Sequence, residues 1–113
     1  LDPDRLMEFW ANEEISCVSF GRDRVMGQED LRAHYESVFA IWAETQLAWL
    51  PGSTIDVLSP ELALFQGTAR QATTDQDGPS YVSHVHFTEL LKKIDGAWKI
   101  QRNHVSGRTV QEG

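Results

Sequence analysis

The sequence lacks several features that would place it quickly in a class of protein. It has a single cysteine, Cys17, among 113 residues, so no disulfide can form within the chain and nothing calls for an oxidising compartment. No apolar run approaches the roughly 20 residues of a membrane-spanning helix, and no signal peptide opens the chain. We therefore expect a cytoplasmic protein with no membrane partner.

Positive charge is also scarce. The chain has 10 Lys and Arg residues against 17 Asp and Glu residues, which gives a formal net charge of −7. A protein that follows nucleic-acid phosphates needs a basic face, so this balance argues against a nucleic-acid partner. The sequence also has no glycine-rich phosphate loop, no cysteine pair and no Ser–His–Asp order, which excludes the simplest nucleotide and nucleophile assignments.

The composition that remains is that of one folded domain. Hydrophobic residues make up 41% of the chain and charged residues 24%, as in ordinary globular proteins. A chain of this length has room for one hydrophobic core, so we treat residues 1–113 as a single domain.

Helical periodicity is confined to the first part of the chain. Asp2 and Pro3 suit the N-cap and first turn of a helix, which we predict over residues 1–12. A longer apolar stripe predicts a second helix over residues 28–42. The members of this stripe are Leu31, Tyr35, Val38 and Trp42.

The rest of the chain has the alternation of β-strands. Residues 15–20 form one predicted strand, residues 45–106 form four or five antiparallel strands, and residues 107–113 form a frayed tail. Helices gathered at one end of such a sheet predict an α+β fold. We expect a cone-shaped, curved antiparallel sheet wrapped around the N-terminal helices, with an apolar pocket inside.

Two short motifs connect this pattern to a known family. Val25–Arg32 places a glycine at the start of a helix after a strand, and Asp95–Ile100 is followed by His104–Ser106. At this spacing the chain resembles the SnoaL-like branch of the nuclear transport factor 2-like superfamily. The resemblance implies a cone-shaped α+β barrel that forms a homodimer through its sheet. It also implies a family that includes isomerases, dehydratases, cyclases and hydrolases as well as proteins without catalysis.

The last hairpin decides which side chains share a face. Its sequence suits a three-residue turn in which Gly96 is left-handed and forms a bulge. This register pairs Lys93 with Ala97 and places His86 opposite His104. We favour it because of the turn chemistry.

A two-residue turn is the alternative register. It pairs Ile94 with Ala97 and Phe87 with His104. It also moves His84 and His86 to the other face, because a shift of one residue reverses every side chain.

The bulged register gathers the candidate catalytic groups inside the cone. We expect His104 and His86 to move a proton, since imidazole titrates near neutral pH, and Arg102 to hold a developing oxyanion. Aromatic and apolar neighbours would bind a flat molecule. The residues expected to contact this ligand are His84, Thr88, Trp98, Ile100, Trp10, Tyr35 and Trp49.

Plainer interpretations of the same residues remain open. The histidines could bond to one another or be exposed at the sheet end, Arg102 could pair with Glu89, and large aromatics commonly fill cores. The three histidines also have the spacing of a metal triad. No carboxylate is clearly placed beside them, and the family is mostly metal-free, so we predict no metal and no cofactor.

Three further groups receive weaker assignments. Cys17 is predicted to be a buried, unreactive thiol, and His34 a partly exposed helix residue. Glu13 and Glu14 are predicted to lie in a solvated loop, where they form a weak candidate for a catalytic acid.

The function predicted from these observations is that of a small-molecule pocket protein. It would be an isomerase, dehydratase or cyclase that acts on a small apolar or aromatic molecule by histidine acid/base chemistry without a cofactor. The alternative is a non-catalytic dimeric ligand-binding or protein-association module. In both cases we expect a homodimer through the convex sheet face, where the bulged register leaves Val85, Phe87 and Leu91.

Overall fold

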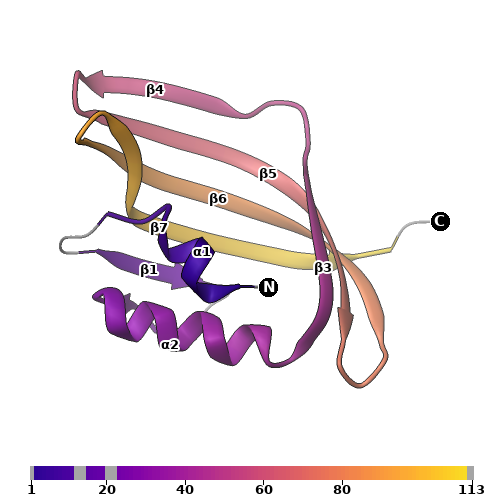
Figure 1. Cartoon of the computed structure of the whole chain (residues 1–113). Helices are drawn as coiled ribbons and strands as arrows, with labels where there is room; N and C mark the ends of the chain where they lie inside the picture. The colour runs from indigo at the N-terminus through magenta and orange to yellow at the C-terminus, as the bar shows by residue number, and fades with distance from the viewer. Residues whose placement is uncertain (1, 12–14, 20–22, 112–113) are drawn as a thin grey trace.

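The computed structural model describes residues 2–11, 15–19 and 23–111. Within them two helices and seven strands form the α+β fold that the sequence predicts (Figure 1). The elements are α1 (Pro3–Met7), β1 (Ser16–Ser19), β2 (Val25–Met26), α2 (Gln28–Phe39), β3 (Trp42–Trp49), β4 (Thr54–Ser59), β5 (Leu62–Asp75), β6 (Ser80–Ile94) and β7 (Ala97–Val110). Neither of these helices is long and apolar enough to cross a bilayer.

Both helices begin as predicted and end earlier. The Asp2 side chain accepts a hydrogen bond from the Asp4 amide at 3.0 Å, which confirms the N-cap. The chain leaves α1 early because the Phe9 carbonyl and Ala11 amide both bond to Ile100 of β7, at 2.8 Å each. Similarly, α2 stops before Trp42, because Trp42 already pairs with β5.

The strands form one curved sheet in the order β2-β1-β7-β6-β5-β3, and β4 also pairs with β5. The sheet is mixed rather than antiparallel throughout, because β1 runs parallel to β7. The last strand is also longer than predicted. Residues 107–110 continue β7 and pair with β6, where a frayed tail was expected.

The β6–β7 turn is the two-residue alternative rather than the bulged form we favoured. Ile94 pairs with Ala97, and both turn residues have positive φ, at 50° for Asp95 and 82° for Gly96. Such a turn matches the right-handed twist of the two strands, which explains why the Asp–Gly pair adopts it.

A bulge lies farther along the same hairpin. Leu91 pairs with Ile100 and Leu90 pairs with Arg102, so Gln101 is the extra residue of β7. Beyond it the pairing agrees with neither predicted register. The bulge therefore decides which β7 side chains share a face with those of β6.

The helices cover one face of the sheet, which we call the inner face. Here Val85 is 1% exposed and its partner Ala69 on β5 is 0% exposed. Phe87 and Leu91 alternate in phase with Val85 and lie on the same face. The expectation that these three residues lie on the convex face is therefore wrong.

Burial on the inner face is uneven. Helices α1 and α2 lie near β1 and β7, while β4 forms the far side of the sheet (Figure 1). A buried cluster occupies the helix-covered end, and it comprises Trp10, Ala11, Ile15, Cys17 and Leu31. At the other end Trp49 is 54% exposed and Val57 is 70% exposed. The inner face thus runs from a closed core to an open apolar rim.

Candidate functional site

The histidines favoured by sequence reasoning lie on the outer face of the sheet. His84, His86 and Thr88 alternate with the buried residues of β6, and Arg102 and His104 alternate with those of β7. They share one face, as expected, but that face is turned away from the helices, and His86 and His104 are exposed. The expectation that they point into the cone is wrong. Val85 is the β6 residue buried on the inner face, and His84 and His86 on either side of it point the opposite way.

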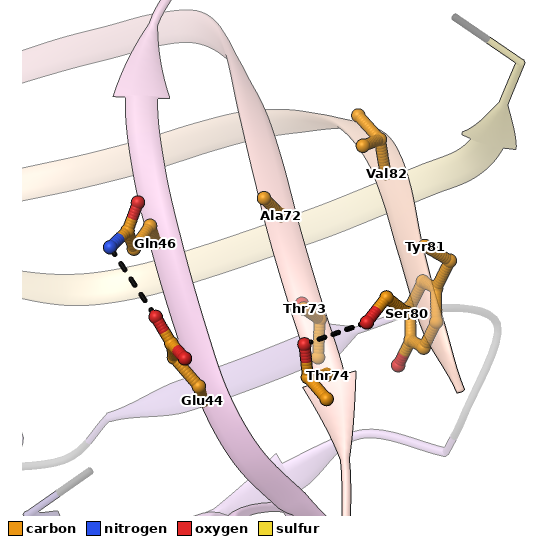
Figure 2. A pocket seen from close by; sticks show the side chains of 8 residues that line it. All are labelled: Glu44, Gln46, Ala72, Thr73, Thr74, Ser80, Tyr81 and Val82. Carbon is orange, nitrogen blue, oxygen red and sulfur yellow. Dashed lines mark hydrogen bonds between the residues drawn. The ribbon is translucent and has the colours of Figure 1, made fainter. Parts of the chain in front are cut away.

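Two shallow hollows lie on this outer side. Figure 2 shows the first, of about 240 Å³, at the β3–β5–β6 end of the sheet. Its lining residues are Glu44, Gln46, Ala72, Thr73, Thr74, Ser80, Tyr81 and Val82. The hydroxyls of Thr74 and Ser80 bond to each other at 2.9 Å across it. The second, of about 380 Å³, includes His86, whose Nδ1 lies 2.9 Å from the Thr68 hydroxyl.

Neither hollow brings together an acid and a base. The described part of the chain also contains no group of three or more His, Cys, Asp or Glu side chains arranged to hold a metal ion.

A row of polar side chains crosses the inner face beneath α2. Asn103 of β7 lies between Cys17 of β1 and Glu89 of β6. The Cys17 thiol donates to Asn103 Oδ1 at 3.3 Å, and Asn103 Nδ2 donates to Glu89 Oε2 at 2.7 Å. On the helix side, Trp10 Nε1 donates to the Tyr35 hydroxyl at 3.2 Å. The candidate site consists of these five residues.

Burial sets the protonation of this site. Desolvation raises the pKa of Glu89, and the hydrogen bond from Asn103 opposes part of that rise. Burial and the nearby Glu89 charge raise the pKa of Cys17 to about 11, so the thiol stays protonated at neutral pH. Burial, with the same charge as a smaller cause, also raises the pKa of Tyr35. The pKa of Glu89 is thus shifted upward, toward neutral pH. Its neighbours Cys17 and Tyr35 stay protonated and can act as hydrogen-bond donors.

A second polar pair lies next to this row. Ser19 Oγ is 3.2 Å from His34 Nε2, and the His34 ring lies 5.6 Å from the Tyr35 ring. The pair joins β1 to α2. It brings an imidazole to the helix side of the inner face, and His34 is partly exposed on α2, as the sequence predicted.

An aromatic wall adjoins Glu89 toward the open rim. Phe65 is the direct cross-strand partner of Glu89. The Trp49 ring lies 5.2 Å from Phe65 and 5.1 Å from Phe87, edge-on to the first and inclined to the second. Gly67 leaves room for this packing, because a Cβ there would lie 3.3 Å from Trp49 and 2.9 Å from Phe65.

The predicted ligand contacts divide between the two faces. Tyr35 and Trp49 belong to the inner site and its aromatic wall. Trp10, which is 4% exposed, belongs both to the site and to the buried core. Ile100 packs against the same core rather than beside the histidines. Trp98 is 42% exposed near the hairpin end. His84 and Thr88 lie on the outer face.

Sequence reasoning missed Glu89 and Asn103 as site residues, and it missed Ser19 as the partner of His34. A signal for Glu89 was present, since this charged residue stands in the same alternating phase as Val85 and Phe87. Cys17 is buried, as predicted. Glu13 and Glu14 lie outside the residues that the structure describes.

Solved structures with the same fold include proteins named as enzymes. A proposed scytalone dehydratase from Novosphingobium aromaticivorans has a TM-score of 0.81 and 16% identity, covering 96% of this chain and 71% of its own. A ketosteroid isomerase-like protein from Erwinia carotovora atroseptica has a TM-score of 0.80 and 18% identity, covering 98% and 83%.

Another solved structure with the same fold is not named as an enzyme. It is a proposed calcium/calmodulin-dependent protein kinase II association domain from Xanthomonas campestris, with a TM-score of 0.81, 18% identity, and coverage of 94% and 74%. No curated protein sequence matches the chain. The family model of the SnoaL-like domain matches residues 1–110. The chain therefore belongs to the SnoaL-like domain family.

Proposed function

We propose that this protein catalyses proton transfer on a small, largely apolar molecule, with Glu89 as the base and without a cofactor. The observation that carries the proposal is a carboxyl group on the helix-covered face whose pKa burial raises. Carboxylates tuned in this way are suited to general acid/base work near neutral pH. The proposal replaces His104 and His86 by Glu89 as the proton-moving group.

The reaction class follows from the groups around Glu89. Its Oε2 accepts from Asn103, and Oε1 accepts no hydrogen bond from any described residue, so Oε1 is the oxygen for a substrate proton. The Tyr35 hydroxyl accepts from Trp10 and keeps its own proton as a donor. Glu89 would remove a proton beside a carbonyl, and Tyr35 would stabilise the oxyanion that forms. Return of the proton from Glu89 to another carbon completes an isomerisation. Transfer of the same proton to a departing β-hydroxyl releases water and completes a dehydration.

The aromatic wall supports a flat apolar substrate. Trp49, Phe65 and Phe87 form one surface next to Glu89, on the side where the inner face opens to solvent. Such surfaces bind planar rings through offset and edge-on contacts. A carbonyl compound with a small ring or a conjugated chain fits both the wall and the base.

Hydrogen exchange with solvent tests the proposal without knowledge of the natural substrate. The protein is incubated in D₂O with a panel of small cyclic ketones and β-hydroxyketones, and deuterium beside the carbonyl is followed by mass spectrometry. We expect catalysed exchange that Glu89→Gln reduces a hundredfold or more. Glu44→Gln, on the exposed outer edge, is the control and should exchange like the unchanged protein. Equal exchange in Glu89→Gln would contradict the assignment of the base.

A non-catalytic association module is the second candidate. Its support is the similarity to the proposed kinase association domain and the exposed rim. The rim side chains are Leu47, Trp49, Ile55 and Val57, which are 52%, 54%, 63% and 70% exposed. This function predicts no exchange with any ketone of the panel, together with binding of an apolar probe that Trp49→Ala weakens.

We also propose a homodimer through the outer face. Its apolar contacts would come from Leu64 and Leu90, which are half-buried cross-strand partners on that face. Light scattering at high concentration should give a dimer mass that Leu90→Asp reduces to a monomer. A monomer mass for the unchanged protein would refute this interface.

A further inference from the structure

A chain of two directed hydrogen bonds connects the only cysteine to the proposed base. The three side chains come from neighbouring strands and stand in one cross-strand row, with Cys17 paired to Asn103 and Asn103 paired to Glu89. Asn103 is 8% exposed and Cys17 is 3% exposed, so this part of the row is shielded from solvent. Its geometry is 3.3 Å from Cys17 Sγ to Asn103 Oδ1 and 2.7 Å from Asn103 Nδ2 to Glu89 Oε2.

The amide of Asn103 has one accepting end and one donating end. Its neighbours on the two sides therefore decide which way it faces. An ionised Glu89 can only accept, and it needs the NH₂ end. That orientation turns the amide oxygen toward Cys17, which must then supply a donor. Burial keeps the Cys17 thiol protonated, so the donor is present throughout the neutral range.

The opposite orientation has the reverse effect. If the amide turned over, its oxygen would face a Glu89 carboxylate oxygen, and only a protonated Glu89 could hydrogen-bond to it. The donor at Cys17 therefore favours the orientation that stabilises the ionised, base-competent form of Glu89. This effect opposes the desolvation that favours the neutral acid.

We propose that Cys17 is a positioning residue, whose thiol fixes the Asn103 amide so that its NH₂ group stabilises ionised Glu89. The inference rests on the proposed function only where Glu89 acts as a base. The charge of Glu89 contributes to the raised pKa of Cys17 from β1 and of Tyr35 from α2. The His34 ring lies beside Tyr35 on α2, and the cross-strand partners of Glu89 on β5 and β7 are Phe65 and Asn103, which do not ionise.

A pair of substitutions separates the donor from the volume of the side chain. Cys17→Ser keeps a hydrogen-bond donor, and Cys17→Ala removes it with a similar size. The titration of the Glu89 carboxyl carbon is followed by NMR in each protein. We expect the midpoint to rise by about one pH unit in Cys17→Ala, because the Asn103 amide is then no longer held with its NH₂ group toward the Glu89 carboxylate. In Cys17→Ser the midpoint should stay within a few tenths of its original value.

A double substitution shows whether the effect travels through the amide. Asn103→Ala should raise the Glu89 midpoint by itself, and adding Cys17→Ala to it should then change nothing further. Cys17→Val, which also lacks a donor, replaces Cys17→Ala if the smaller side chain prevents folding. An unchanged midpoint in the donor-free variants, an equal rise in Cys17→Ser, or an additive rise in the double variant would each overturn the proposal.

The pH dependence of exchange gives the functional readout. The acid limb of the exchange rate should move to higher pH in Cys17→Ala and return in Cys17→Ser, in step with the NMR midpoint. A midpoint that shifts as expected in a protein without exchange activity would refute the proposed function and leave the positioning role intact. If the protein catalyses exchange and the acid limb of its pH profile is the same in Cys17→Ala, the positioning role alone would be refuted.

Discussion

Substitution of Gly67 by alanine tests the packing of the aromatic wall. An added Cβ would lie 2.7 Å from Ser53 Oγ, 2.9 Å from Phe65 Cζ and 3.3 Å from Trp49 Cζ3. The first two distances are too short for stable contact, so the Ser53 hydroxyl and the Phe65 ring must move. Overpacking of this kind typically costs about 1–3 kcal/mol.

A favourable effect of the same change reduces this cost. Alanine in a strand is more stable than glycine by roughly 0.5–1 kcal/mol, because the unfolded chain loses less entropy on folding. The expected net loss is therefore about 1–2 kcal/mol in the free energy of unfolding. This loss corresponds to a fall of roughly 4–8 °C in Tm for a domain of this size.

Chemical denaturation of Gly67→Ala, followed by Trp fluorescence, measures the loss. The matched background is Phe65→Leu, which removes the ring atom nearest the new methyl group, so Gly67→Ala should cost less there. A variant as stable as the unchanged protein would refute the account of the wall. So would an equal loss in both backgrounds, since the Phe65 ring would then not resist the added group.

Three further predictions follow from the core, the buried acid and the hairpin. Leu31→Ala should lower the free energy of unfolding by about 2–5 kcal/mol in urea titrations, because Leu31 is 1% exposed inside the buried cluster. The folded state binds the Glu89 proton more tightly than the unfolded chain does, so the destabilisation that Glu89 causes is absent below the ordinary glutamate pKa. This destabilisation grows as pH rises from the ordinary glutamate pKa to the raised pKa of the folded state, and it is constant above that. Glu89→Gln should flatten this part of the stability–pH curve. Gly96→Val should destabilise the hairpin by more than 1 kcal/mol in thermal melts, since φ at Gly96 is 82°.

Local patterns were sufficient to predict the fold class. The Asp2 cap, the stripe of α2 and the alternation of the long strands each act over a few residues. Together they predicted an α+β sheet with helices at one end. The element ends were less predictable, because pairing between distant segments set them. Trp42, for example, completes an apolar helical stripe and yet begins β3.

The candidate site depended on register, which local patterns specify poorly. The Asp95–Gly96 turn suits two registers, and a bulge at Gln101 then shifts the pairing again. No turn signal in the sequence marks Gln101. The charged Glu89 in an apolar phase of β6 was the one local indication of the inner site. Its partners Cys17 and Asn103 come from distant parts of the chain.

The parallel pairing of β1 with β7 has a consequence for biosynthesis. Cys17 and Asn103 are 86 residues apart in the chain, and β7, which lies between β1 and β6, is made after the other described strands. Until β7 leaves the ribosome, β1 has no neighbour on that side and β6 presents a bare strand edge. Pairings of such long sequence separation form slowly, and incomplete chains with open edges aggregate readily. We expect the domain to complete its folding only after β7 has been made, which makes β7 the element whose truncation a cell tolerates least.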